Sequence, residues 1–178
     1  MNLEGLGMQM SKQLSFIIPE MDLNFRLARL LIIFDKLSYS SKGNPVLNIE
    51  RVAIFEFLVK YPHILKLVLR SKKENTNIEY NSKYMGSIES LFPDRNALNN
   101  LSSVRVLLIK LIRYNLIRIE KVKKELYFVI TEEGEQCNKE ISSQYTNEIS
   151  LFCEDLKVLR STSINDLKKI ITPLIKGV

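Results

Sequence analysis

The sequence contains few of the residues from which catalytic and metal sites are usually built. Its 178 residues include one histidine, His63, two cysteines and no tryptophan. Metal ligands occur as spaced clusters of histidine, cysteine and acidic residues, and His63 follows Pro62 in an apolar stretch that lacks such spacing. Phosphate-binding loops of the GxxxxGK[ST] and GxGxxG types are missing as well. The sequence therefore predicts a non-enzymatic protein with no catalytic residues, no metal and no cofactor.

Long apolar runs are also missing. No run reaches the roughly 18 residues that a membrane span needs, and the first residues lack the pattern of a secretory signal. Cys137 and Cys153 are predicted to share one long helix, where a disulfide between them is geometrically impossible. Unpaired thiols are typical of a reducing compartment. We therefore expect a cytoplasmic protein that makes no membrane contact.

The most informative stretch is a helix followed by a basic hairpin, at residues 101–131. Ser102 or Ser103 can cap the helix, and apolar side chains then recur at helical spacing. The helix is expected to end at Asn115, because asparagine tolerates left-handed backbone angles. After it, two strand-like runs flank a polar turn at 121–125. A helix that leads into a basic-tipped hairpin predicts a winged helix.

This stretch carries almost all of the net charge of +6. Seven cations against two acids give residues 102–125 a net charge of +5, enough to neutralise several phosphates without reading sequence. Base-specific recognition is less well supported, because no asparagine or glutamine lies in the middle of the helix. Apolar residues lie between the helix cations, and such a mixed face equally suits a protein partner. The candidate DNA or partner contacts are Arg105, Val106, Ile109, Lys110, Arg113, Lys121, Lys123 and Lys124.

Amphipathic helices are predicted on both sides of the winged helix. Their expected starts, from capping residues and apolar periodicity, are Asp22, Asn48, Pro62, Tyr84, Glu132 and Ser163. Residues 71–83 are read as a surface loop. The helix that starts at Glu132 is expected to continue to Leu159, with its acidic side chains on the solvent face. This acidity would repel a phosphate backbone, so any nucleic-acid contact is expected on the side of the hairpin.

The predicted fold is mainly α with a small β-hairpin, a winged helix-turn-helix with additional N- and C-terminal helices. Residues 1–21 are expected to form an N-terminal arm and residues 22–134 the helical winged-helix domain. Residues 135–178 are expected to form C-terminal helices that pack on this domain or on a partner.

Two stretches resemble the middle component of ABC-three-component systems. They are NFRLARLLIIFDKL at residues 24–37 and LNIERVAIFEFLVKYPHIL at residues 47–65, and the resemblance extends over roughly residues 23–134. It implies a non-catalytic adaptor, of the group that includes Lamassu-type anti-phage defence. It also implies two partners, an SMC/Rad50-like ATPase subunit and a nuclease-like effector subunit that the adaptor holds or restrains.

The alternative is a winged-helix DNA-binding transcriptional regulator. That function predicts a homodimer formed through the helix at 132–159, which binds one palindromic site with a large specificity ratio. An adaptor instead predicts a protein partner on the mixed apolar and basic face of the helix before the hairpin.

Overall fold

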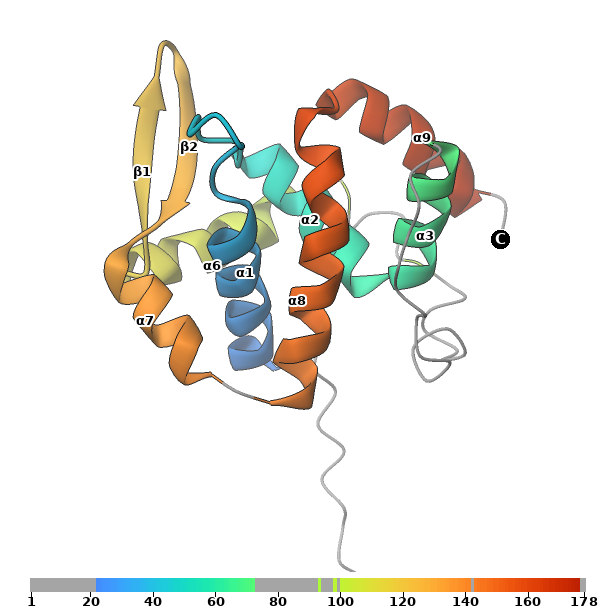
Figure 1. Cartoon of the computed structure of the whole chain (residues 1–178). Coiled ribbons are helices and arrows are strands. Elements are labelled where there is room, and N and C mark those ends of the chain that lie inside the picture. Colours follow the sequence, from blue (N-terminus) through green and yellow to red (C-terminus); the bar gives the residue numbers. More distant parts are fainter. Residues whose placement is uncertain (1–21, 73–92, 94–97, 99, 142, 177–178) are drawn as a thin grey trace, which may run out of the picture.

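The computed structural model describes residues 22–72, 93, 98, 100–141 and 143–176 (Figure 1). The expected arm at 1–21, the expected helix at 84–92 and nearly all of the loop at 71–83 lie outside these residues. The α-helices are α1 (Leu23–Leu37), α2 (Ile49–Lys60), α3 (Pro62–Ser71), α6 (Leu101–Arg113), α7 (Glu132–Glu140), α8 (Gln144–Leu156) and α9 (Ile164–Lys176). A 3-10 helix, η2 (Lys157–Ser161), follows α8, and the strands β1 (Ile117–Val122) and β2 (Glu125–Ile130) form an antiparallel hairpin. The predicted mainly α fold with one small hairpin is confirmed.

Several helices begin where local capping chemistry predicted. The Asp22 carboxylate accepts a hydrogen bond from the amide of Asn24 at 2.7 Å, and the Asn48 side chain accepts one from Arg51 at 3.0 Å. Pro62 is the first residue of α3, where its missing amide hydrogen costs no hydrogen bond. The start of α9 follows the same rule, because the Ser163 hydroxyl accepts a hydrogen bond from the amide of Asp166.

The cap of α6 differs from the prediction. The Asn100 side chain accepts the hydrogen bond from the amide of Ser103, at 3.2 Å, so Ser102 and Ser103 lie inside the first turn and do not cap it. Asn100 is one of the strongest capping residues, and its position one residue before the helix leaves the serine hydroxyls to other partners. At the other end Asn115 adopts a positive φ of 56°, as expected for the residue that follows a helix.

The prediction of one long helix from Glu132 to Leu159 is wrong, because the chain forms two helices there. α7 ends at Glu140 and α8 begins at Gln144. Ser143 and Thr146 form a reciprocal capping box, in which each side chain accepts a hydrogen bond from the backbone of the other. Two backbone amides are satisfied at once in this way, which favours a new helix start over continuation.

The two cysteines therefore lie on different helices, and both are free thiols. Cys153 of α8 is fully buried, and this burial raises the pKa of its thiol above the ordinary value. Cys137 of α7 is half-buried.

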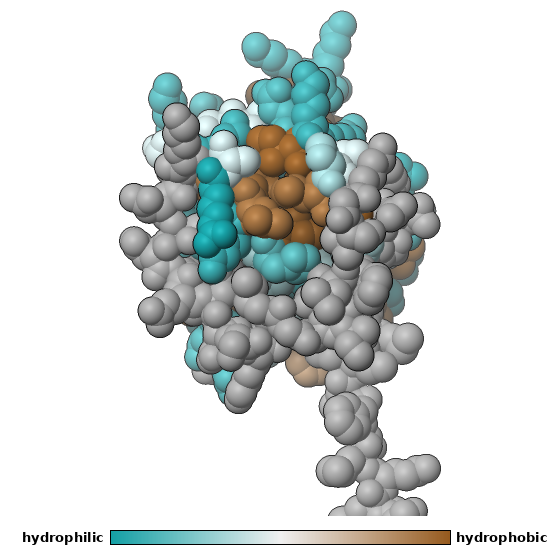
Figure 2. Space-filling view, turned by 90° about the vertical axis from the view of Figure 1, so that its right-hand side faces the viewer, coloured by the Kyte–Doolittle hydropathy of each residue, from teal (hydrophilic) through white to brown (hydrophobic). Residues whose placement is uncertain are grey.

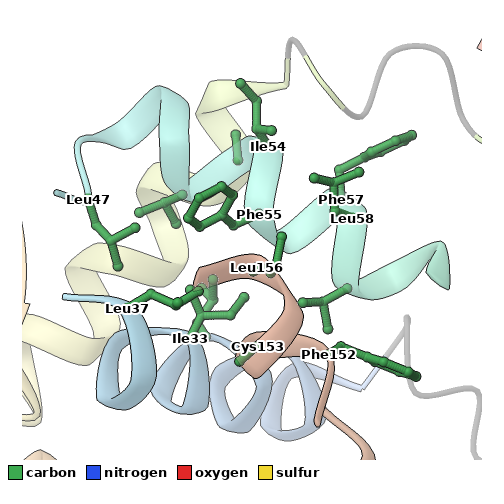
Figure 3. Packing of buried hydrophobic residues seen from close by; sticks show 14 of the residues in the cluster. Ile33, Leu37, Leu47, Ile54, Phe55, Phe57, Leu58, Phe152, Cys153 and Leu156 are labelled. Carbon is green, nitrogen blue, oxygen red and sulfur yellow. The ribbon is translucent and has the colours of Figure 1, made fainter. Parts of the chain in front are cut away.

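The core forms where α1, α2 and α8 meet (Figure 3). Ile33 of α1, Phe55 of α2 and Leu156 of α8 are completely or almost completely buried there. The hairpin and α7 lie at one end of the molecule and α3 and α9 at the other (Figure 1). None of the helices in the described residues has the length and apolar content needed to cross a membrane.

The hairpin is anchored at its base and projects beyond the helices. Ile117 pairs with Ile130 at the base, and Val122 pairs with Glu125 next to the turn. Both base residues are buried, whereas the side chains at the turn are exposed. The free edge of β2 meets the connection between α1 and α2, where the Phe128 amide donates a hydrogen bond to the Leu47 carbonyl at 2.8 Å.

Candidate docking surface

α6 is held against the body by its inner face. Val104, Leu107, Leu108 and Leu111 are buried in the core, and their spacing of three and four residues places them on one side of the helix. The opposite side of α6 therefore faces away from the core along the whole length of the helix.

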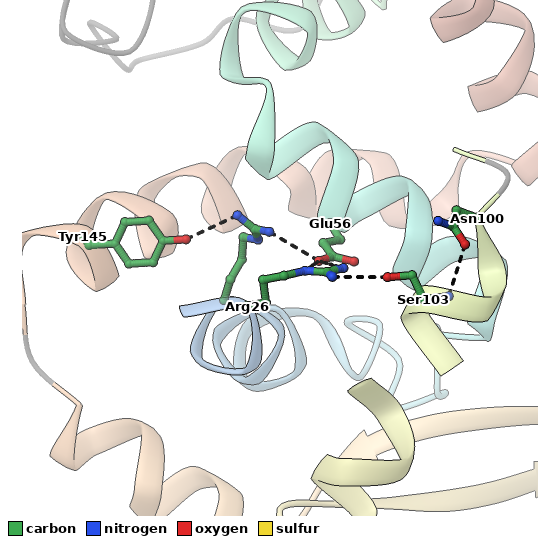
Figure 4. Close-up of polar contacts among 6 residues, drawn as sticks. Arg26, Glu56, Asn100, Ser103 and Tyr145 are labelled. Carbon is green, nitrogen blue, oxygen red and sulfur yellow. Dashed lines mark hydrogen bonds and ion pairs between the residues drawn. The ribbon is translucent and has the colours of Figure 1, made fainter. Parts of the chain in front are cut away.

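A polar network fixes the first turn of α6 (Figure 4). The Ser103 hydroxyl accepts a hydrogen bond from the Arg26 guanidinium of α1 at 3.2 Å. Arg26 also donates to the Glu56 carboxylate of α2, and Arg29 donates to that carboxylate and to the Tyr145 hydroxyl of α8. One cluster of charges thus links α1, α2, α6 and α8. These links hold α6 at a defined position, so its outer face is presented on a rigid support.

The outer face of α6 combines apolar and basic side chains. Val106 is 55% exposed and Ile109 is 44% exposed. Arg105 and Arg113 are exposed beside them, and Lys110 is half-buried. Every predicted contact residue of this helix thus keeps exposed surface, in the mixture of apolar and basic character that the sequence predicted.

The remaining predicted cations lie at the tip of the hairpin. Lys121, Lys123 and Lys124 are all exposed, and Lys123 adopts the left-handed backbone with a φ of 56°. α6 ends at the base of the hairpin, so the tip lysines stand at the far end of the hairpin from it (Figure 1). The predicted basic patch is therefore two groups of cations, one on the helix and one at the tip.

Neither group of cations is neutralised by a carboxylate within the described part of the chain. None of the six predicted basic residues makes an ion pair with another described residue. Arg118 in β1 is different, because it pairs with Glu120 at 2.6 Å and donates to the Tyr39 hydroxyl. The Glu120 hydrogen bond raises the pKa of Arg118. Arg118 therefore serves the attachment of the hairpin, and the other cations remain available to an external anion.

Sequence reasoning missed several exposed apolar residues near this surface. Tyr114 follows α6, while Ile119 and Leu126 lie on one face of the hairpin, and all three are exposed. Alternation along a strand shows which residues share a face. It does not show where the supporting helices end, so the exposure of Ile119 was not predictable from the buried Ile117 on the same face.

The histidine, cysteine and acidic side chains of the described residues do not gather into a metal-binding cluster. No group of three histidine, cysteine or acidic side chains there lies close enough to hold a metal ion. His63 lies on α3 with its ring roughly perpendicular to the ring of Tyr61, and burial lowers its pKa.

Together these features define a class of protein: a mainly α chain whose helix α6 runs into a projecting two-stranded hairpin, consistent with a winged-helix-like arrangement. A family model narrows this class. It describes Middle Component 4 of ABC-three component (ABC-3C) systems and matches residues 37–169, about three quarters of the chain. The chain belongs to this family. The comparison with curated proteins gives no match, and neither does the comparison with solved structures.

Proposed function

We propose that this protein is the non-catalytic adaptor of an anti-phage defence complex of the Lamassu type. In this function it binds an SMC/Rad50-like ATPase and a nuclease-type effector, and it restrains the effector until the ATPase responds to infection. Membership of a middle-component family supports partners within one multi-component system. In this proposal α6 and the β1–β2 hairpin together form a winged helix.

The observation that carries the proposal is the outer face of α6. Val106 and Ile109 are large apolar side chains that remain about half exposed, between cations that make no ion pair with another described residue. Such a face, supported by a rigid core, is typical of a protein interface with an apolar centre and a polar rim.

Direct contact with the DNA backbone is a second candidate function, and it involves the tip of the hairpin. Lys121, Lys123 and Lys124 project from the hairpin tip without ion pairs among the described residues. Three free ammonium groups suit phosphates, and they supply no base-specific recognition. The adaptor would then contact DNA while it is bound to the ATPase.

The test is co-purification of the chain with the ATPase and effector that are encoded beside it. Val106→Asp and Ile109→Asp should each abolish binding of one component and leave the fold intact, because both side chains are already exposed. The exposed and polar Ser102 provides the matched control, and Ser102→Asp should keep the complex.

Two results would contradict this proposal. A folded wild-type chain that captures neither component is not an adaptor of such a system. A homodimer that binds one palindromic site with a large specificity ratio would instead support the transcriptional regulator.

A further inference from the structure

We infer that the α3–α9 face, formed by the outer sides of α3 and α9, is a second docking surface and binds an acidic amphipathic helix of a partner protein. This inference rests on the proposed adaptor function and specifies how one small chain holds two partners at once. Figure 1 places this face at the end of the molecule opposite the hairpin.

The first observation is apolar surface that remains exposed on the described residues of α3 and α9. Figure 2 shows a hydrophobic patch with hydrophilic residues beside it, on the side of the molecule where α3 and α9 lie. Leu67 of α3 is 40% exposed, and Ile170 and Leu174 of α9 are only half-buried. Contiguous apolar surface beside polar residues marks a contact site more often than scattered apolar residues do.

Leu67 is separate from the contact that joins the two helices to the body, whereas Ile170 and Leu174 also pack against the core with part of their surface. The inward residues Ile64 and Val68 of α3, and Leu167 and Ile171 of α9, are almost completely buried. Leu67 lies outside this set, so the fold does not depend on its side chain being apolar. Its exposed surface is therefore available to a partner.

The second observation is the sign of the charge on these two helices. α3, the residue after it and the described side chains of α9 carry five cations and one acid. These cations are Lys66, Arg70, Lys72, Lys168 and Lys169. Lys168 pairs with Glu50 at 2.8 Å, whereas the exposed Arg70 and Lys169 make no ion pair with another described residue. Complementarity requires carboxylates around the apolar contact of the partner.

These two observations select an amphipathic helix with acidic flanks. An apolar stripe that enters a helix-lined surface, with charges beside it, is a common mode of peptide recognition. The basic α6 surface of a second copy would be repelled by Arg70 and Lys169. A lipid bilayer would need a broad exposed apolar stripe. Leu167, Ile171 and Ile175 of α9 are instead buried in the core.

The test uses the full chain, purified with the ATPase and the effector of its own system. One variant is Leu67→Asp, and a second reverses two charges, Arg70→Glu with Lys169→Glu; all three side chains are exposed. The matched control is Thr172→Asp, which adds a carboxylate at another exposed position of α9. Circular dichroism and the urea midpoint establish that each variant is folded.

Both test variants should weaken binding of one component at least ~10-fold, the size of a typical interface hot spot. They should leave the other component bound, and Val106→Asp should release the component that they retain. Raising the salt from about 0.1 M to about 0.5 M should weaken the wild-type contact, since solvent-exposed charges are screened. The charge-reversal variant should lose this salt dependence.

Several results would overturn the inference. If the wild-type chain binds both components and the Leu67→Asp variant retains both, or loses both, the α3–α9 face is no separate docking site, and the proposed function still stands. If the wild-type chain binds neither component, the proposed function fails as well. Wild-type self-association in sedimentation that Leu67→Asp removes assigns the face to a second copy. Binding to phosphatidylserine–phosphatidylcholine vesicles that Leu67→Asp removes assigns it to a membrane.

Discussion

The Arg29 guanidinium of α1 lies 3.3 Å from the Glu56 carboxylate of α2, inside a core that is otherwise mostly apolar. Their side chains are only 2% and 8% exposed. The same carboxylate oxygen also pairs with Arg26 at 3.1 Å. Glu56 is therefore the central anion of the network that fixes the first turn of α6.

Replacement of Glu56 by Gln should destabilise the protein by ~3 to 5 kcal/mol, because it leaves buried guanidinium charge without its carboxylate. The measurement is the free energy of unfolding in urea. Glu50→Gln is the control, since the Glu50 pair with Lys168 is partly exposed on both sides and should contribute only ~0 to 1 kcal/mol. Equal losses in the two variants would show that the network does not stabilise the core.

Gly134 sets how closely α7 approaches the hairpin. A Cβ at this position would overlap the Leu116 carbonyl oxygen and lie 2.8 Å from Cγ1 of Ile130. Gly134→Ala should therefore destabilise the protein by ~1 to 3 kcal/mol through overpacking, although alanine favours a helix more than glycine. Glu133→Ala, at an exposed position of the same helix, should be nearly neutral. A Gly134→Ala variant with a higher thermal midpoint than the wild type would contradict this close approach.

Much of the fold was predictable because its signals are local. Asp22, Asn48 and Pro62 start helices through bonds and backbone angles set within three residues of each position. The break between α7 and α8 was missed because Ile141, Tyr145 and Ile149 keep helical spacing across it. Periodicity alone does not detect a helix that ends and restarts in phase.

The candidate surface was predictable in part for the same reason. Helical spacing separates Val106 and Ile109 from the buried residues of α6, so their exposure followed from the sequence. The distance between the α6 cations and the hairpin tip depends on the direction of the hairpin relative to α6. Tertiary contacts set this direction, so local sequence patterns do not predict it. The burial of Arg29 with Glu56 is tertiary too, because charged residues on apolar helices more often face solvent.

His63 provides a prediction about pH. Its Nδ1 is buried and has no hydrogen-bond partner among the described residues, and burial lowers its pKa from the ordinary value of 6.5. Between the two pKa values the folded protein binds fewer protons than the unfolded chain. The contribution of His63 to the free energy of unfolding is therefore most favourable above pH 6.5, the pKa of the unfolded chain. It becomes less favourable as the pH falls from 6.5 towards the lowered pKa of the folded protein.

The urea midpoint should accordingly decrease between about pH 7.5 and about pH 5.5, a range in which most carboxylates stay ionised. His63→Gln should remove part of this decrease. If the variant and the wild type lose stability equally over this range, His63 is not the group that titrates.

The hairpin tip provides a test of DNA contact that is independent of protein partners. Replacing Lys121, Lys123 and Lys124 with Ala should weaken binding to short duplexes of two unrelated sequences by the same factor. It should also reduce the slope of the logarithm of the binding constant against the logarithm of salt concentration by ~1 for each lysine that contacts a phosphate. Fluorescence anisotropy over a salt series measures both quantities.

Lys139→Ala, at an exposed cation of α7, is the control and should change neither. A triple variant with the wild-type slope would show that the tip does not touch the phosphates, and one that weakens binding to a single duplex would indicate base recognition instead.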